Sequence, residues 1–399
     1  MTWSPRPGTP ADLDAVFDVR AQAFGIGETD RVRFVQDTPT EGLFVVDAPG
    51  VGIVGALRVL PMGQYLGGRR VPMGGVATVV VRPEWRGRGV AARMIDTALA
   101  HMRSEGLAVS VLHPATLRPY RRAGWELAGE RPRARVPTRA LAALTPGEPD
   151  RLRRLGRGDI GAIRACYDRV AAGRHGWVDR SEELWRAAEA ATFSDLAYAY
   201  GVEGDDGTLS GFCRFRLVGH GAGHDRPGHR LVLDDLVAAD ATAELTLWAF
   251  LGGHGMQVGA VEVEGPDTDA LALVLGEQDV RHAASLRWMA RVVDVPGALG
   301  RRGYPAGVRT DLHLHVTDPE AAWNDGPWIL TVEEGRGSVR RGGTGALRLG
   351  ARGLAAAAVG ATPAVTLRRA GLLHGGGPDA WSRFDAVFAG PPATMPDHF

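Results

Sequence analysis

Hydrophobic positions in the first third of the chain follow helical spacing and then strand spacing. Thr9 and Pro10 precede apolar residues three or four apart, which predicts a capped helix that buries Leu13, Val16 and Phe17. Dense apolar and β-branched runs predict strands at residues 43–47, 51–60, 76–81 and 108–113. Glycines within 63–68 mark a turn.

The rest of the chain repeats this alternation. Residues 230–238, 244–251 and 260–264 predict a strand, a helix and a strand, the same order as residues 76–111. The last part predicts strands at 312–316 and 328–333 and helices at 354–359 and 381–388. Prolines and a glycine at 145–150 interrupt both the helical and the strand period, which indicates a domain boundary. The sequence predicts a mixed α/β (α+β) fold in consecutive domains, 1–145, 146–300 and 301–399.

Composition narrows the possible partners and the compartment. The 46 basic residues are all arginine and balance 46 acidic residues, so nothing favours nucleic acid or an anionic membrane as a partner. No run reaches the roughly 18 apolar residues of a membrane span. Two cysteines, Cys166 and Cys213, without a CxxC motif or a signal peptide, indicate a reduced, cytoplasmic setting.

The most informative segment is 75–99, where a β-branched run ends at Pro83 and passes through an Arg/Gly turn into a helix. Gly87 and Gly89 let the backbone approach a ligand, and the helix that begins at Val90 places its free amides at the positive end of a dipole. A pyrophosphate suits such a position. Neither a GxGxxG fingerprint nor a Gly-Lys-Ser/Thr loop is present.

Two other segments give little indication of a functional site. The turn at 239–243 has no glycine or arginine and contains Asp240, so the second strand–helix–strand unit is interpreted as a duplicate that has lost its cofactor. His220, His224 and His229 lie in a Gly/Pro-rich stretch without acidic or thiol partners at ligand spacing, which favours a solvated loop and no metal site.

The residues from Val79 to Ala91, VVVRPEWRGRGVA, resemble the acetyl-CoA loop of GNAT acetyltransferases, V-x-V-x-P-x-x-R/Q-x-x-G-x-G/A, at every fixed position. Three further features resemble the enhanced intracellular survival (Eis) family of actinobacterial GNAT enzymes: PYRRAGW at 119–125, WMARVVDV at 288–295, and an aromatic last residue. That resemblance covers essentially the whole chain. It implies two tandem GNAT-like domains, a sterol-carrier-protein-like domain at 301–399, and a homohexamer.

The resemblance also implies roles for individual residues. The general acid falls on Tyr120, and the general base is the terminal carboxylate of Phe399. A Ser-Glu pair that contacts the cofactor in the family is replaced by Ala115 and Thr116. Asp397 is a candidate for part of an acidic substrate pocket, although His398 follows it. The acetyl-CoA contacts fall on Val79, Val80, Val81, Gly87, Arg88, Gly89, Val90, Ala91, Ala92, Ala115 and Thr116.

These features predict an acetyl-CoA-dependent N-acetyltransferase that acts on a cationic amine, such as an aminoglycoside, a polyamine or a lysine side chain. The first alternative keeps this chemistry with a protein lysine or a small metabolic amine as acceptor. The second is an acyl-CoA sensor or lipid carrier without turnover, whose last domain is the binding module.

Overall fold

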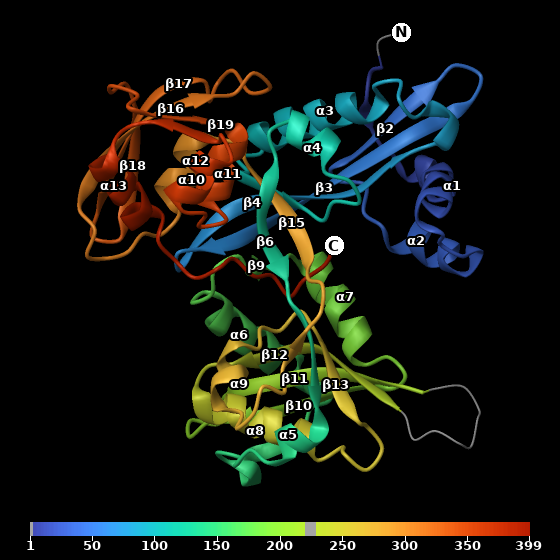
Figure 1. Ribbon diagram of the computed structural model, residues 1–399. Coiled ribbons are helices and arrows are strands. Elements are labelled where there is room, and N and C mark those ends of the chain that lie inside the picture. Colours follow the sequence, from blue (N-terminus) through green and yellow to red (C-terminus); the bar gives the residue numbers. More distant parts are fainter. Residues whose placement is uncertain (1–2, 220–228) are drawn as a thin grey trace. The chain divides into compact units, whose positions relative to one another are not determined.

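The computed structural model describes residues 3–219 and 229–399, which form two compact units drawn from non-consecutive stretches (Figure 1). The first unit contains residues 1–128, 288–392 and 399, and the second contains 129–287 and 393–398. Each unit therefore takes chain from both sides of the linker predicted at 145–150. The domain boundaries at residues 145 and 300 remain predictions.

The first unit contains a mixed sheet covered by helices. α1 (Leu13–Phe24) buries Leu13, Val16 and Phe17, which confirms the helix predicted after Thr9. The strand predicted at 51–60 continues to residue 66 because Gly63 pairs with Pro72 in the ladder, so the turn is confined to 67–68. The strands in spatial order are β1 (Arg6–Pro7), β2 (Leu43–Ala48), β3 (Gly52–Leu66), β4 (Arg69–Val81), β5 (Val109–Leu112), β15 (Leu286–Val292) and β6 (Glu126–Arg131).

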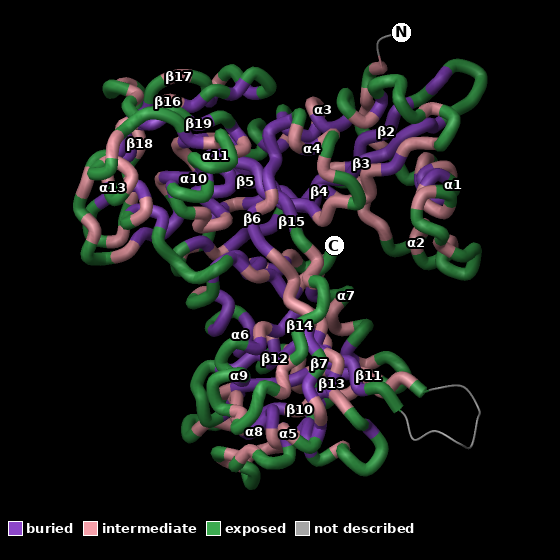
Figure 2. Tube along the Cα trace, in the orientation of Figure 1, coloured by how far each residue is buried: buried purple, intermediate pink, exposed green. Residues whose placement is uncertain are grey.

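α3 (Val90–Ser104) packs its apolar stripe on this sheet. Met94, Ile95 and Leu99 meet Val59 and Val76 in one buried cluster, and buried residues follow the central strands (Figure 2). The shorter helices of this part are α2 (Arg31–Asp37) and α4 (Arg118–Arg122). β4, α3 and β5 therefore form the strand–helix–strand unit that the sequence predicts at 76–111.

A second sheet in the first unit carries the last hundred residues. Its strands in order are β18 (Arg336–Arg341), β17 (Gly326–Glu333), β16 (Thr310–Thr317), β19 (Leu347–Gly350) and β20 (Leu373–Gly375). Its helices are α10 (Val295–Arg301), α11 (Ala351–Ala358), α12 (Ala364–Arg369) and α13 (Pro378–Phe388). All four elements predicted in this part are present, with boundaries shifted by a few residues.

The second unit is built around its own sheet. β12 (Arg230–Ala238) and β13 (Ala260–Glu264) are parallel and are joined by α8 (Ala241–Gly252), which confirms the repeated strand–helix–strand order. The strands in spatial order are β14 (Arg281–His282), β7 (Arg133–Pro137), β13 (Ala260–Glu264), β12 (Arg230–Ala238), β11 (Leu209–Val218), β10 (Ala197–Glu203) and β8 (Leu152–Arg154). The other elements are α5 (Thr138–Ala142), α6 (Ile160–Ala171), β9 (Val178–Asp179), α7 (Glu182–Thr192), α8 (Ala241–Gly252) and α9 (Asp269–Val274).

Within residues 3–219 and 229–399, no helix has both the length and the apolar character that crossing a membrane requires. Cys166 and Cys213 are both buried thiols that form no disulfide. His220 and His224 lie outside the described residues, so the loop predicted there is not tested. Among the described side chains, no three His, Cys, Asp or Glu residues gather in a way that could hold a metal ion.

Candidate active site

The turn between β4 and α3 presents its backbone to solvent. Gly87 and Gly89 have φ values of 73° and 83°, and a Cβ atom built on either would meet nothing within 4 Å. Gly89 is the N-cap of α3, and no side chain caps this helix. The first amides of α3, from Val90 to Ala92, therefore remain available at the positive end of the helix dipole. This cradle has the geometry and the charge to bind a pyrophosphate.

Aromatic contacts brace this turn. The indole Nε1 of Trp3 donates a hydrogen bond of 2.7 Å to the carbonyl oxygen of Arg88. Trp3 also meets Trp85 edge to face, with ring centroids 5.3 Å apart, and the guanidinium of Arg88 lies 4.7 Å from the centroid of Trp85. This role of Trp3 is not predictable from the sequence, because no local pattern connects residue 3 with residue 88.

β4 carries a bulge just before this turn. Ala56 of β3 pairs with Val80 and Arg58 pairs with Ala77, so Thr78 and Val79 together face Leu57. Thr78 adopts a φ of 53°, a left-handed conformation that is uncommon for a β-branched residue. A bulge of this kind leaves one residue outside the regular ladder. Thr78 and Val79 therefore interrupt the regular β3–β4 ladder near the end of the pairing of β4 with β5.

β4 and β5 part at the same place. Their parallel pairing joins residues 73–75 to residues 109–111 and ends at the pair Gly75 and Val111, whereas β4 runs six residues further. The ring of Phe399 lies at this point: a Cβ atom built on Gly75 would be only 2.6 Å from its Cε2. The ring of His113, which directly follows β5, meets that of Phe399 edge to face at 5.6 Å. The last residue of the chain thus packs where the two strands separate.

Tyr120 lies on α4, the short helix that follows β5, and it belongs to the buried cluster beneath α3. Its side chain is almost fully buried, and this burial raises the pKa of its phenol to about 12. The phenol is therefore neutral and able to donate a proton across the physiological pH range.

Ala115 and Thr116 are exposed in the loop between β5 and α4. Thr116 borders a cavity of about 630 Å³ whose remaining lining residues are Leu117, Arg118, Arg121, Arg122 and Arg352. The buried carboxylate of Glu126 binds two of these guanidiniums, Arg121 at 2.7 Å and Arg352 at 2.7 Å. Although burial alone would raise the pKa of Glu126, these hydrogen bonds prevail and lower it. The excess positive charge of this cavity suits phosphate groups.

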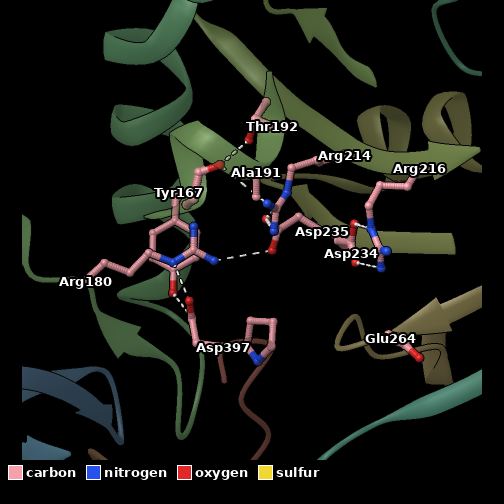
Figure 3. Close-up of polar contacts among 12 residues, drawn as sticks. Tyr167, Arg180, Ala191, Thr192, Arg214, Arg216, Asp234, Asp235, Glu264 and Asp397 are labelled. Carbon is pink, nitrogen blue, oxygen red and sulfur yellow. Dashed lines mark hydrogen bonds and ion pairs between the residues drawn. The ribbon is translucent and has the colours of Figure 1, made fainter. Parts of the chain in front are cut away.

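Asp397, expected in an acidic substrate pocket, has both carboxylate oxygens engaged by the second unit (Figure 3). Arg180 Nε donates to Oδ1 at 2.7 Å, and the hydroxyl of Tyr167 lies 3.0 Å from Oδ2. This carboxylate is therefore a structural contact of the chain. The sequence offered no signal for that, because its partners are more than 200 residues away.

The corresponding helix start in the second unit is closed by the chain itself. The side chain of Asp240 accepts a hydrogen bond of 2.8 Å from the amide of Ala243 and so caps α8. Gly147 lies against the same turn, since a Cβ atom built on it would be 2.5 Å from Thr242 Cγ2. An anion-binding cradle like that at Gly87 and Gly89 is therefore absent from this turn.

The predicted contacts of the first unit thus gather at the carboxyl ends of β4 and β5, the edge where ligands bind in open α/β sheets. The strand segment 79–81 is the end of β4, and the loop and helix start 87–92 follow that strand. Residues 115–116 and Tyr120 on α4 follow β5. Phe399 reaches this edge from the other end of the sequence. These residues therefore lie on elements that leave one edge of the sheet in the first unit, and their roles in a site remain a prediction.

Comparison with known proteins agrees with this architecture. Residues 4–128 and 176–292 each match an acetyltransferase (GNAT) domain model, and residues 295–396 match a sterol carrier protein domain model. An uncharacterized N-acetyltransferase of Streptomyces avermitilis is 31% identical over 98% of this chain and 97% of its own length. A second, from Streptomyces coelicolor, is 32% identical over 77% of this chain and 76% of its own.

Solved structures share the whole fold. A GCN5-related N-acetyltransferase from Anabaena variabilis superposes with a TM-score of 0.90, 31% identity and full coverage of both chains. One from Kribbella flavida gives a TM-score of 0.85 and 30% identity over 100% of this chain and 98% of its own. Eis1 from Mycobacterium abscessus has a TM-score of 0.84, 22% identity and full coverage of both chains, which shows a common fold. These matches confirm the predicted fold class, and the chain belongs to the GNAT family of N-acetyltransferases.

Proposed function

We propose that this enzyme transfers the acetyl group of acetyl-CoA to a primary amine of a cationic acceptor such as an aminoglycoside, a polyamine or a lysine side chain. The observation that carries the proposal is the position of Phe399 against Gly75, where β4 and β5 part. The ring of Phe399 lies at the sheet edge that also carries the anion cradle of α3, and this position supports the carboxylate of the same residue as the base. Acetyl transfer to an amine requires a base that takes the proton of the amine and a loop that holds the cofactor beside it.

Three segments hold the cofactor in this proposal. The amides at 87–92 bind its pyrophosphate, Ala115 and Thr116 contribute backbone contacts, and the strand segment Val79–Val81 lies along its acyl end. Bound acetyl-CoA supplies an activated thioester. A backbone amide at the bulge of β4 orients the acetyl oxygen and stabilises the negative charge that develops on it.

Two groups move protons. Tyr120 protonates the departing thiolate, a role that a phenol kept neutral by burial can perform. The terminal carboxylate of Phe399 accepts a proton from the acceptor amine. An ordinary α-carboxyl has a pKa of about 3.3 to 3.7, so the partial burial of Phe399 has to raise it, or a water molecule has to relay the proton.

We further propose that the enzyme is a member of the Eis group, assembles as a homohexamer and works in the cytoplasm. In this view residues 1–145 form the catalytic GNAT domain and residues 146–300 a GNAT-like domain without a phosphate loop. Residues 301–399 form the sterol-carrier-like domain that supplies the carboxylate. The cap that Asp240 provides to α8 supports the loss of cofactor binding in the second copy.

A lipid carrier or acyl-CoA sensor is the alternative, and the sterol carrier protein match is the observation in its favour. A cavity of about 210 Å³ in that part of the chain is lined in part by Asp311, His313 and Arg383. Because burying a lipid tail against such groups leaves them without partners, this cavity does not support carriage.

Thiol release from acetyl-CoA, measured with kanamycin, spermidine and a lysine-containing peptide, tests the function. Mass spectrometry of each mixture identifies the product. An increase of 42 Da on an amine establishes the acceptor class. Tight binding of acetyl-CoA without release in any mixture supports the sensor or carrier alternative instead.

Gly89→Asp places a carboxylate at the cradle and is expected to weaken acetyl-CoA binding at least about 100-fold, or about 2.7 kcal/mol. The matched control is Gly106→Asp, near the other end of α3. Its φ is also positive, 68°, and its Cβ atom also meets open space. Calorimetry with both variants separates charge at the cradle from backbone strain, and equal affinities for the two would remove the loop from the cofactor site.

Removing Phe399, or adding one alanine after it, is expected to lower kcat at least about 100-fold, because either change displaces the terminal carboxylate. The alanine extension keeps the phenyl ring and so separates the base from its packing. The Michaelis constant for acetyl-CoA should change less than about threefold. Wild-type kcat in the extended chain would exclude the carboxylate as the base.

Tyr120→Phe is expected to lower kcat by about 10² to 10⁴, since it removes the proton donor and little volume. The raised pKa of Tyr120 has a second consequence. The phenol loses its proton only as the pH approaches about 12, so kcat/KM should show no alkaline decline from Tyr120 up to pH 10. A pH profile of the wild type, with an apparent pKa below 10 that disappears in Tyr120→Phe, contradicts this.

A further inference from the structure

The cavity of about 630 Å³ beside α4, here called the arginine cavity, collects guanidiniums from two distant stretches of the chain. Arg118, Arg121 and Arg122 come from α4, whereas Arg352 comes from α11, in the part that matches the sterol carrier protein model. Both stretches belong to the first unit, so the cavity is formed within one compact body. The function proposed above gives none of these four side chains a role.

The buried carboxylate of Glu126 fixes two of these guanidiniums. Its Oε1 accepts from Arg121 Nη2 at 2.7 Å, and its Oε2 accepts from Arg352 Nε at 2.7 Å. The side chain of Glu126 is only 7% exposed, so the pair is held from within the protein. Both arginines use Nε and Nη2 for this carboxylate. Each Nη1 therefore keeps two N–H groups that no described residue accepts.

The other two arginines make the cavity strongly positive. In residues 3–219 and 229–399, no carboxylate pairs with Arg118 or Arg122. Four guanidiniums therefore share the single carboxylate of Glu126, which leaves an excess of three positive charges. A phosphomonoester carries nearly two negative charges at neutral pH and has three oxygens that accept from guanidiniums. This group suits the cavity better than a singly charged carboxylate or phosphodiester does.

The arginine cavity adjoins the elements that carry the anion cradle of α3. Thr116, which we propose as a backbone contact of the cofactor, also lines the cavity. α4 contacts α3, and Leu117, another lining residue, packs on the same buried cluster as Val90 at the start of α3. Gly124, just after α4, admits the start of α11, since a Cβ atom built on it would be only 2.9 Å from Ala351 Cβ.

We propose that the arginine cavity binds the 3′-phosphate of acetyl-CoA and that Arg352 brings the sterol-carrier-like part of the chain into cofactor selection. This inference rests on the proposed use of acetyl-CoA and assigns a second phosphate site to it. The pyrophosphate and the 3′-phosphate of CoA are attached to the same ribose. A protein that binds the first at the start of α3 therefore meets the second close by. The 3′-phosphate is a phosphomonoester, the group that the charge of the cavity suits.

Calorimetry with acetyl-CoA and with acetyl-dephospho-CoA, which lacks only the 3′-phosphate, tests this inference without any acceptor. The wild type should bind acetyl-dephospho-CoA at least about 30-fold more weakly, because several charge-assisted hydrogen bonds are lost. Arg122→Met and Arg352→Met should each weaken acetyl-CoA binding about tenfold and change acetyl-dephospho-CoA binding less than about twofold. Wild-type affinities for the two cofactors that agree within about twofold would overturn the proposal.

Arg369→Met is the matched control. Arg369 is an exposed residue of α12 in the same unit and does not line the cavity, so this variant removes the same charge elsewhere. Both cofactors should bind to it within about twofold of the wild type. A loss of acetyl-CoA affinity equal to that of Arg122→Met would reflect net charge alone and overturn the proposal. Thermal unfolding curves show whether Arg352→Met, which takes one partner from Glu126, still folds; Arg122→Met takes none.

A free phosphate ion has the same chemistry as the 3′-phosphate, so a second titration separates the two sources. Inorganic phosphate should bind to the enzyme saturated with acetyl-dephospho-CoA, which leaves the cavity open, and should not bind to the enzyme saturated with acetyl-CoA. Equal phosphate binding to both complexes assigns the cavity to a separate anion and overturns the proposal. Absence of binding by both cofactors contradicts the proposed function itself, whereas equal binding of both contradicts only this inference.

Discussion

Parallel strands β4 and β5 pair through only three residue pairs before they part, and the whole candidate site depends on this separation. A fully paired sheet would bury both strand edges in hydrogen bonds and leave a ligand no backbone to bind. Here the bulge at Thr78 turns β4 away from regular pairing, Phe399 packs at the point of separation, and α3 begins just beyond it. The backbone of β4 and the first amides of α3 therefore lie along one edge of the sheet.

Features that depend on neighbouring residues were accessible from the sequence. The strand, turn and helix from Val76 to Ser104 follow from β-branched density, two glycines and helical spacing, and the structure contains them with small shifts. The repeated unit around α8 and the elements of the last hundred residues were found in the same way. The roles of Tyr120 and Phe399 came from family resemblance, since no periodicity marks a proton donor.

Features that join distant residues were not accessible. β15 pairs with β5 across about 180 residues, and β7 pairs with β13 across more than 120 residues. Neither pairing leaves a local pattern in the sequence. The same holds for the contact of Trp3 with Arg88 and for the ion pair of Arg180 with Asp397. Gly75 is a further case: its missing side chain makes room for the ring of Phe399, which no turn signal reveals.

The first unit is built from non-consecutive stretches of the chain, so it can be completed only after residues 288–392 have been synthesised. Residues 1–128 leave the ribosome long before β15 is made, so the edge of β5 waits for a partner until residues 288–292 appear. Phe399, whose ring packs against Gly75 at the same edge, is added to the chain later still. A chain made only as far as residue 128 therefore lacks both the strand that pairs with β5 and the residue that we propose as the base.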